Sequence, residues 1–281
     1  MEFIRVVGND GRVYFGGNQD WFQSNTRARG GCGPVSGANI LLMTAWKQAD
    51  TQKKLGVQIS GDGVISQNDY TTFMNAVYDT MGTWEIPVLK WVYDRCRRDN
   101  KFFRIISPNN GRSFYGYVKG VLRFGIQHDL YLKAHALSTI FCDYDTGLSF
   151  IQKGLEECKA VGLLTSYNRH ALTLFHGEYD CQDAPYYAKG GMQNHFVTIT
   201  SIDLSNGKVR LAVSTWGRIA MIDYSELAAS WQHKKALDSA LIYWSPATSA
   251  ETTESIKEAA RVLRTAVWNS IWKSSGSAEK V

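Results

Sequence analysis

One cysteine, Cys32, stands where its neighbours favour chemical reactivity. It lies in Gly30-Gly31-Cys32-Gly33-Pro34, at the start of an apolar-periodic stretch that predicts a helix over 33–49. Glycines let the backbone turn sharply and a substrate approach closely, and proline suits a first helical turn. Free N–H groups and the positive end of the helix dipole favour thiolate over thiol and stabilise a developing oxyanion. The pattern predicts a nucleophilic cysteine of lowered pKa; a structural cysteine packed in a glycine-rich turn is the alternative.

The remaining cysteines lack this setting. One lies on a charged helix, one ends a helix and two lie in aspartate-rich loops: Cys96, Cys158, Cys142 and Cys181. An odd number of cysteines leaves at least one unpaired, and the chain has no Cys-x-x-Cys pair for zinc. We therefore expect neither a disulfide framework nor a metal site.

A thiolate nucleophile works with a histidine, and His195 is the best placed of the six histidines. In Asn194-His195-Phe196-Val197 it is the first residue of a predicted strand, after a glycine-containing loop. The next strand ends in Ser214-Thr215-Trp216-Gly217. Antiparallel pairing brings residues 214–216 back beside His195, so we expect a group that orients the imidazole there.

The elements that position these residues are segregated along the chain, which predicts an α+β fold. An N-terminal hairpin precedes a polar, irregular segment, and a polar loop is expected over 50–66. Helices are predicted over 33–49, 70–81, 84–99, 113–125, 146–158 and 252–272, and strands over 161–166, 196–202, 208–215, 219–223 and 240–244. The chain thus divides into a mainly helical subdomain (1–158, with a helical insertion over about 50–158), an antiparallel β subdomain (159–247), and a C-terminal amphipathic helix with a frayed tail (248–281).

The composition and charge of the chain argue against several classes of protein. The chain has 281 residues, of which 44% are apolar and 20% charged, as in an ordinary globular protein. A net charge of +5 without a block of five like charges argues against nucleic-acid binding. No apolar run approaches the roughly 18 residues needed to cross a bilayer. The first seventeen residues lack the apolar block of a secretory signal, so we expect a cytoplasmic protein, unless a leader was removed or export follows another route. No phosphate loop or dinucleotide glycine pattern indicates a cofactor.

Taken in order, the motifs resemble those of papain-like cysteine peptidases. Cys-Gly precedes a helix, Asn-His-Phe-Val opens a strand far downstream, and Trp-Gly ends the next strand. The stretch from Gly31 to Asn39 is most similar to bacterial papain-like proteins of the C39-like kind. The resemblance covers 16–46 and 160–245 and implies a papain-like fold, with the nucleophile at a helix start in the helical half and the histidine in the β half.

The resemblance also implies a role for each matching residue. Cys32 is the nucleophile, His195 the general base, and Gln19 the donor to the oxyanion, with Gln23 as the alternative. Papain relatives orient the histidine with an asparagine, whose position is taken here by Ser214; Thr215 or a water is the alternative. Substrate binding falls to the remaining residues of the motifs, Gly31, Gly33, Asn194 and Trp216. Trp216 would also shield the histidine contact from solvent, unless it simply packs in the core.

The function implied is hydrolysis of peptide or amide bonds through a cysteine thiolate, without a cofactor. Acyl or peptidyl transfer on the same fold is one alternative. A non-catalytic papain-like binding module is another, motivated by the serine at position 214. A third is an interaction protein acting through the helical insertion or the C-terminal helix. The specificity and the oligomeric state stay open.

Overall fold

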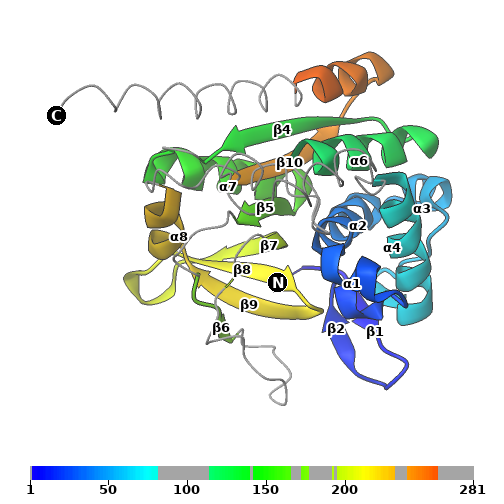
Figure 1. Cartoon of the computed structure of the whole chain (residues 1–281), viewed down its shortest axis with the longest axis horizontal. Coiled ribbons are helices and arrows are strands. Elements are labelled where there is room, and N and C mark those ends of the chain that lie inside the picture. Colours follow the sequence, from blue (N-terminus) through cyan, green and yellow to red (C-terminus); the bar gives the residue numbers. More distant parts are fainter. Residues whose placement is uncertain are drawn as a thin grey trace, which may run out of the picture.

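The computed structural model describes residues 2–81, 114–139, 142–165, 172–176, 192, 195–231 and 239–258. Among these residues, seven strands form one antiparallel sheet in the order β4-β10-β5-β7-β8-β9-β6 (Figure 1). The strands are β4 (Leu132–Ser138), β5 (Val161–Thr165), β6 (Phe175–His176), β7 (His195–Asp203), β8 (Arg210–Thr215), β9 (Arg218–Asp223) and β10 (Ala240–Pro246). Helices accompany this sheet, so the α+β class predicted from the sequence is confirmed.

Helices pack on both faces of the sheet, and strand alternation divides the apolar residues between two cores. Leu164 and Phe196 belong to the core shared with α2 (Cys32–Ala45), whereas their strand neighbours Leu163 and Val197 belong to the other core. Successive side chains of a strand point to opposite faces, which explains the division. The first core also holds α4 (Gln67–Met81) and α6 (Phe114–Gln127), and the second holds α7 (Tyr144–Cys158) and α8 (Tyr224–Trp231).

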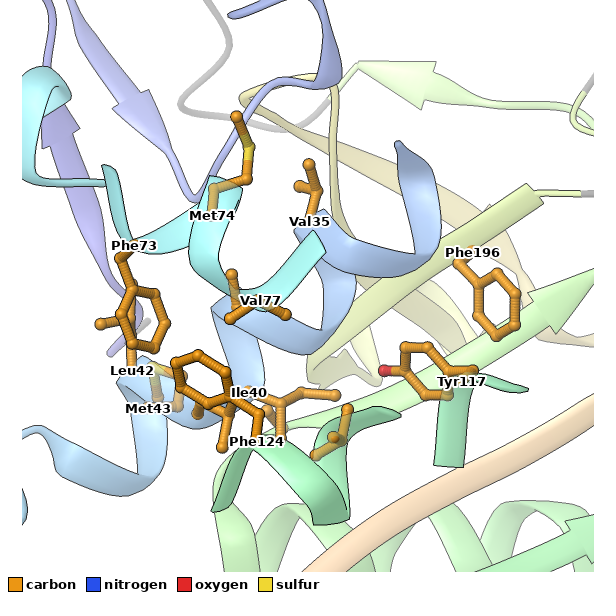
Figure 2. Close-up of a cluster of buried hydrophobic side chains, with 14 of the residues drawn as sticks. Val35, Ile40, Leu42, Met43, Phe73, Met74, Val77, Tyr117, Phe124 and Phe196 are labelled. Atoms are coloured by element: carbon orange, nitrogen blue, oxygen red, sulfur yellow. The ribbon is translucent and has the colours of Figure 1, made fainter. Parts of the chain in front are cut away.

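Helix α2 is enclosed on every side. All of its residues except Thr44 are buried, as expected of a helix that is apolar around its whole circumference. Figure 2 shows the α2 residues Val35, Ile40 and Leu42 among side chains of α4 and α6. The Tyr117 ring of α6 stacks on Phe196 of β7, with ring centroids 4.4 Å apart. The sheet, α4 and α6 therefore fix where α2 begins.

A second, small sheet joins the N-terminus to the end of β8. Its order is β2-β1-β3, made of β1 (Arg5–Val7), β2 (Val13–Phe15) and β3 (Val64–Ser66). The β1–β2 hairpin agrees with the sequence, and β3 pairs parallel to β1. The N–H of Phe15 donates to the carbonyl of Gly217 (3.0 Å), and the N–H of Gly217 donates to the carbonyl of Gly17 (2.9 Å). The segment after β2 is thereby attached to the turn between β8 and β9.

Several elements differ from the sequence prediction. The predicted loop over 50–66 is wrong, because it contains most of α3 (Ala49–Leu55) and also β3. Helix α1 (Asn25–Gly30) lies in the segment that was expected to be irregular, and neither α8 nor the edge strand β4 was predicted. The sequence of β4, Leu-Lys-Ala-His-Ala-Leu-Ser, lacks β-branched residues. The helix that begins at Cys32 ends at Ala45 rather than at residue 49.

Part of the C-terminal prediction can be compared with the structure. Residues 249–258 are helical, and Ser255 accepts a hydrogen bond from the N–H of Ala134 on β4 (3.3 Å). The remainder of the predicted C-terminal helix and the predicted helix over 84–99 lie outside the described residues. In the described part of the chain, no helix combines the length and apolarity needed to span a membrane.

Replacing Gly154 by alanine should test how closely α7 packs on the sheet. An added Cβ would lie 2.5 Å from Cγ2 of Val161 and 2.9 Å from Cδ1 of Tyr243. Overpacking costs about 1–3 kcal/mol, whereas the better helix propensity of alanine contributes about 1 kcal/mol. We therefore expect urea unfolding to show a lower free energy of unfolding for Gly154→Ala. Gly61→Ala is the control, because nothing lies within 4 Å of its added Cβ; equal stability of the two variants would contradict close packing of α7.

Candidate active site

Cys32 and His195 line the same small cleft at the end of the large sheet. Cys32 is the first residue of α2, and His195 is the first residue of β7. The cleft is lined by ten residues: Gln19, Cys32, Val35, Ser36, Asn39, His195, Phe196, Ser214, Thr215 and Trp216. Packing of α2 along β7 brings together these segments, which are far apart in the sequence. The cleft therefore unites the cysteine and the histidine that the sequence singled out.

The protonation of Cys32 differs from the sequence expectation. The residue is only 9% exposed, and burial raises the pKa of its thiol. Hydrogen bonds from the backbone N–H groups of Phe196 and Gly33 act in the opposite direction but do not compensate. Desolvation penalises the charged sulfur more than the helix start favours it, so the prediction of a lowered pKa is wrong.

His195 is held by hydrogen bonds from both its backbone and its ring. Its N–H donates to the Thr165 hydroxyl, which donates in turn to the His195 carbonyl, both at 3.2 Å. Its Nε2 lies 2.9 Å from Oγ1 of Thr215. Burial lowers the pKa of the imidazole to about 4. The ring is therefore neutral near pH 7, as the thiol is.

The hydroxyl beside the imidazole belongs to Thr215, not to Ser214. Strand pairing places Ser214 opposite Thr198, on the face of β7 that alternation assigns away from His195. Ser214 Oγ donates to the carbonyl of Phe15 (2.7 Å) and accepts from Nδ2 of Asn39 (3.3 Å). The prediction of Ser214 as the orienting residue is thus corrected to the alternative, Thr215.

Trp216 covers the histidine from a strained turn. Its ring stacks on that of His195, with centroids 4.3 Å apart and planes inclined by 12°. Trp216 and Gly217 have φ angles of 48° and 73°, so both residues between β8 and β9 are left-handed. That conformation suits a two-residue hairpin turn but is unfavourable for a bulky residue. The stack limits the access of solvent to the imidazole.

Of the two candidate glutamines, Gln19 reaches the cleft. It begins the 3-10 helix η1 (Gln19–Trp21), where Asn18 caps the helix by accepting from the N–H of Asp20 (3.0 Å). Gln23 is exposed and does not line the cleft. The structure thus brings together Cys32, His195 and Gln19 from three separate segments.

The structure does not place three of the expected substrate-binding residues in the cleft. Gly31 and Gly33 do not line the cleft. Gly31 packs against the protein, because a Cβ there would lie 2.5 Å from Cε2 of Phe22. Packing against Phe22 therefore requires a glycine at position 31. Asn194 lies outside the described residues.

Two cleft residues, Ser36 and Asn39, were missed in the sequence. They follow Cys32 by four and seven positions, so they share its face of α2. Polar residues at this spacing on an otherwise apolar helix were the available signal. In the described ranges, no three His, Cys, Asp or Glu side chains lie together as metal ligands.

Comparison with known proteins adds no relative. No protein-family model matches the chain, and no curated protein matches its sequence.

The buried imidazole should make stability depend on pH. Its folded-state pKa of about 4 lies below the ordinary value of 6.5, so the unfolded chain binds the extra proton first as the pH falls. The stability that comes from keeping the imidazole neutral is therefore complete above pH 6.5. Between pH 6.5 and pH 4, the free energy of unfolding falls by about 1.4 kcal/mol per pH unit. Denaturant unfolding between pH 4 and 7 should show a flatter dependence for His195→Gln than for the wild type. His128→Gln, outside the cleft, is the control; a wild-type slope in His195→Gln would mean that the imidazole is not held neutral.

Proposed function

We propose that this protein is a papain-like cysteine peptidase that hydrolyses peptide or amide bonds, with Cys32 as nucleophile and His195 as general base. The observation that best supports this proposal is that both residues line one cleft, Cys32 at the start of α2 and His195 at the start of β7. A cysteine at a helix start beside a histidine at the rim of an antiparallel sheet supports the papain-like assignment. Gln19 in the same cleft supports it further, because an amide there is suited to bind an oxyanion.

The proton moves when the substrate is attacked, since sulfur and imidazole are both neutral at rest. The contact between Nε2 and Thr215 leaves Nδ1 to accept the proton of the Cys32 thiol. As that proton moves, the sulfur bonds to the carbonyl carbon and the carbonyl oxygen becomes an oxyanion. The N–H of Cys32 and the amide of Gln19 stabilise this charge.

Collapse of the oxyanion completes the first half of the reaction. The carbon–nitrogen bond breaks, and protonated His195 gives its proton to the leaving amine. Neutral His195 then takes a proton from water as the water attacks the thioester. The thioester breaks to release a carboxylic acid, and the proton returns to the sulfur.

Thr215 takes the part that an asparagine has in papain relatives. Its hydroxyl accepts a hydrogen bond from Nε2–H and so favours the tautomer with a free Nδ1. The absence of the asparagine motivated the non-catalytic alternative. A hydroxyl at 2.9 Å from the ring supports the catalytic proposal instead.

Peptide-library cleavage followed by mass spectrometry tests the proposal. We expect the wild type to cut library peptides and Cys32→Ala to lose at least about 10⁴-fold in rate, as removal of a nucleophile does. Cys158→Ala is the matched control, because Cys158 is also 9% exposed but lies outside the cleft. An uncut library, or wild-type cleavage by Cys32→Ala, would refute a peptidase role.

Thr215→Val tests the orienting hydroxyl without changing the volume of the side chain. Misorientation of the imidazole should lower kcat roughly 10- to 100-fold and leave KM nearly unchanged. Thr200→Val is the control, since Thr200 is a buried threonine of β7 whose hydroxyl donates to the Ala212 carbonyl (3.2 Å). Steady-state kinetics on a cleaved peptide measure both variants; equal kcat values would remove Thr215 from the mechanism.

A further inference from the structure

We propose that Asn39 is a positioning residue, whose buried amide holds Gly17 against α2 and thereby sets the position of the oxyanion donor Gln19. This inference rests on the proposed function. Asn39 is two helical turns beyond Cys32 and only 1% exposed. One rigid helix therefore carries both the nucleophile and the anchor of the oxyanion segment.

The Asn39 amide uses its full hydrogen-bonding capacity. Its Oδ1 accepts from the N–H of Gly17 (3.1 Å) and from the Tyr70 hydroxyl of α4 (2.6 Å). Its Nδ2 donates to the hydroxyls of Thr198 (3.4 Å) and Ser214 (3.3 Å). A buried amide with two donors and two acceptor sites all engaged has one orientation, because rotation would leave polar groups unpaired.

The segment that Asn39 holds has no room to shift. A Cβ on Gly16 would lie 2.6 Å from Oδ1 of Asn39, and one on Gly17 would lie 2.2 Å from the Tyr70 ring. Gly16 also has a φ of 69°, which favours glycine. The two glycines thus allow the backbone to press directly on Asn39 and Tyr70.

Gly17 is fixed at both of its backbone polar groups. Its N–H donates to Asn39, and its carbonyl accepts from the N–H of Gly217 in the turn that carries Trp216. Gln19 follows only two residues later, at the start of η1. A change in Asn39 therefore displaces the donor amide relative to the sulfur.

Two reactions of Cys32 separate this role from general stability. Acylation by p-nitrophenyl acetate develops an oxyanion, whereas alkylation by iodoacetamide does not. We expect Asn39→Ala and Tyr70→Phe to slow acylation about tenfold through misplacement of Gln19, with the alkylation rate unchanged. In a Gln19→Ala background, either substitution should have no further effect on acylation, because both act through the same donor.

Tyr224→Phe is the matched control for Tyr70→Phe. Both tyrosines are fully buried, and each hydroxyl donates a hydrogen bond of 2.6 Å, that of Tyr70 to Asn39 and that of Tyr224 to the carbonyl of Tyr144. The Tyr70 hydroxyl also lies 3.4 Å from the carbonyl of Val35. Tyr224 lies in the other core, so Tyr224→Phe should acylate at the wild-type rate. If Asn39→Ala fails to fold, Tyr70→Phe still carries the test.

The outcomes distinguish the two proposals. Losses that add to that of Gln19→Ala, or that affect alkylation and acylation equally, would overturn the positioning role alone. Absence of acylation in the wild type would overturn the proposed function and, with it, the need for an oxyanion donor.

Discussion

The cleft depends on the packing of α2 along β7. Cys32 and His195 are far apart in the sequence, and each stands at the first residue of its element. The Ser36 hydroxyl donates to the carbonyl of Val197 (3.3 Å), and Thr198 donates to Ser36 (3.2 Å), so helix and strand are joined by hydrogen bonds as well as by apolar contacts. Since α4 and α6 enclose the rest of α2, the helix cannot slide along the strand without opening the first core.

Burial decides the electrostatics of the cleft. A helix start stabilises negative charge, but the gain is modest compared with the penalty for taking an ionised sulfur out of water. The same penalty acts on the imidazolium, so desolvation raises the pKa of Cys32 and lowers that of His195. The neutral pair suits Thr215 as a partner, because a hydroxyl orients a neutral ring without supplying a charge. In the proposed reaction, charge would develop only as the substrate is attacked, and the backbone N–H groups and Gln19 would stabilise it.

Local signals in the sequence predicted the helix that begins near Cys32, the strand that begins at His195, and the return of β8 beside it. Glycine and proline residues mark the start of the helix. A run of β-branched and aromatic residues after a glycine-containing loop marks the start of the strand. The edge strand β4 could not be predicted in this way, because its place depends on pairing with β10, more than a hundred residues later. The ionisation of Cys32 was mispredicted for a related reason: the helix start is a local feature, whereas desolvation depends on every element packed around the sulfur. Residues 82–113 of the predicted helical insertion lie outside the described residues.

The choice between Ser214 and Thr215 follows from strand geometry alone. Residues paired across an antiparallel ladder share a face, and Ser214 pairs with Thr198. Since residues 195 and 198 are separated by an odd number of positions, alternation turns Ser214 towards α2 and Thr215 towards His195. Two adjacent hydroxyls therefore serve opposite sides of the sheet: one binds the Asn39 amide and the Phe15 carbonyl, and the other binds the imidazole. A single strand end thus joins the segment that carries Gln19 to His195, and a shift of one residue in its register would exchange the two hydroxyls and break both contacts.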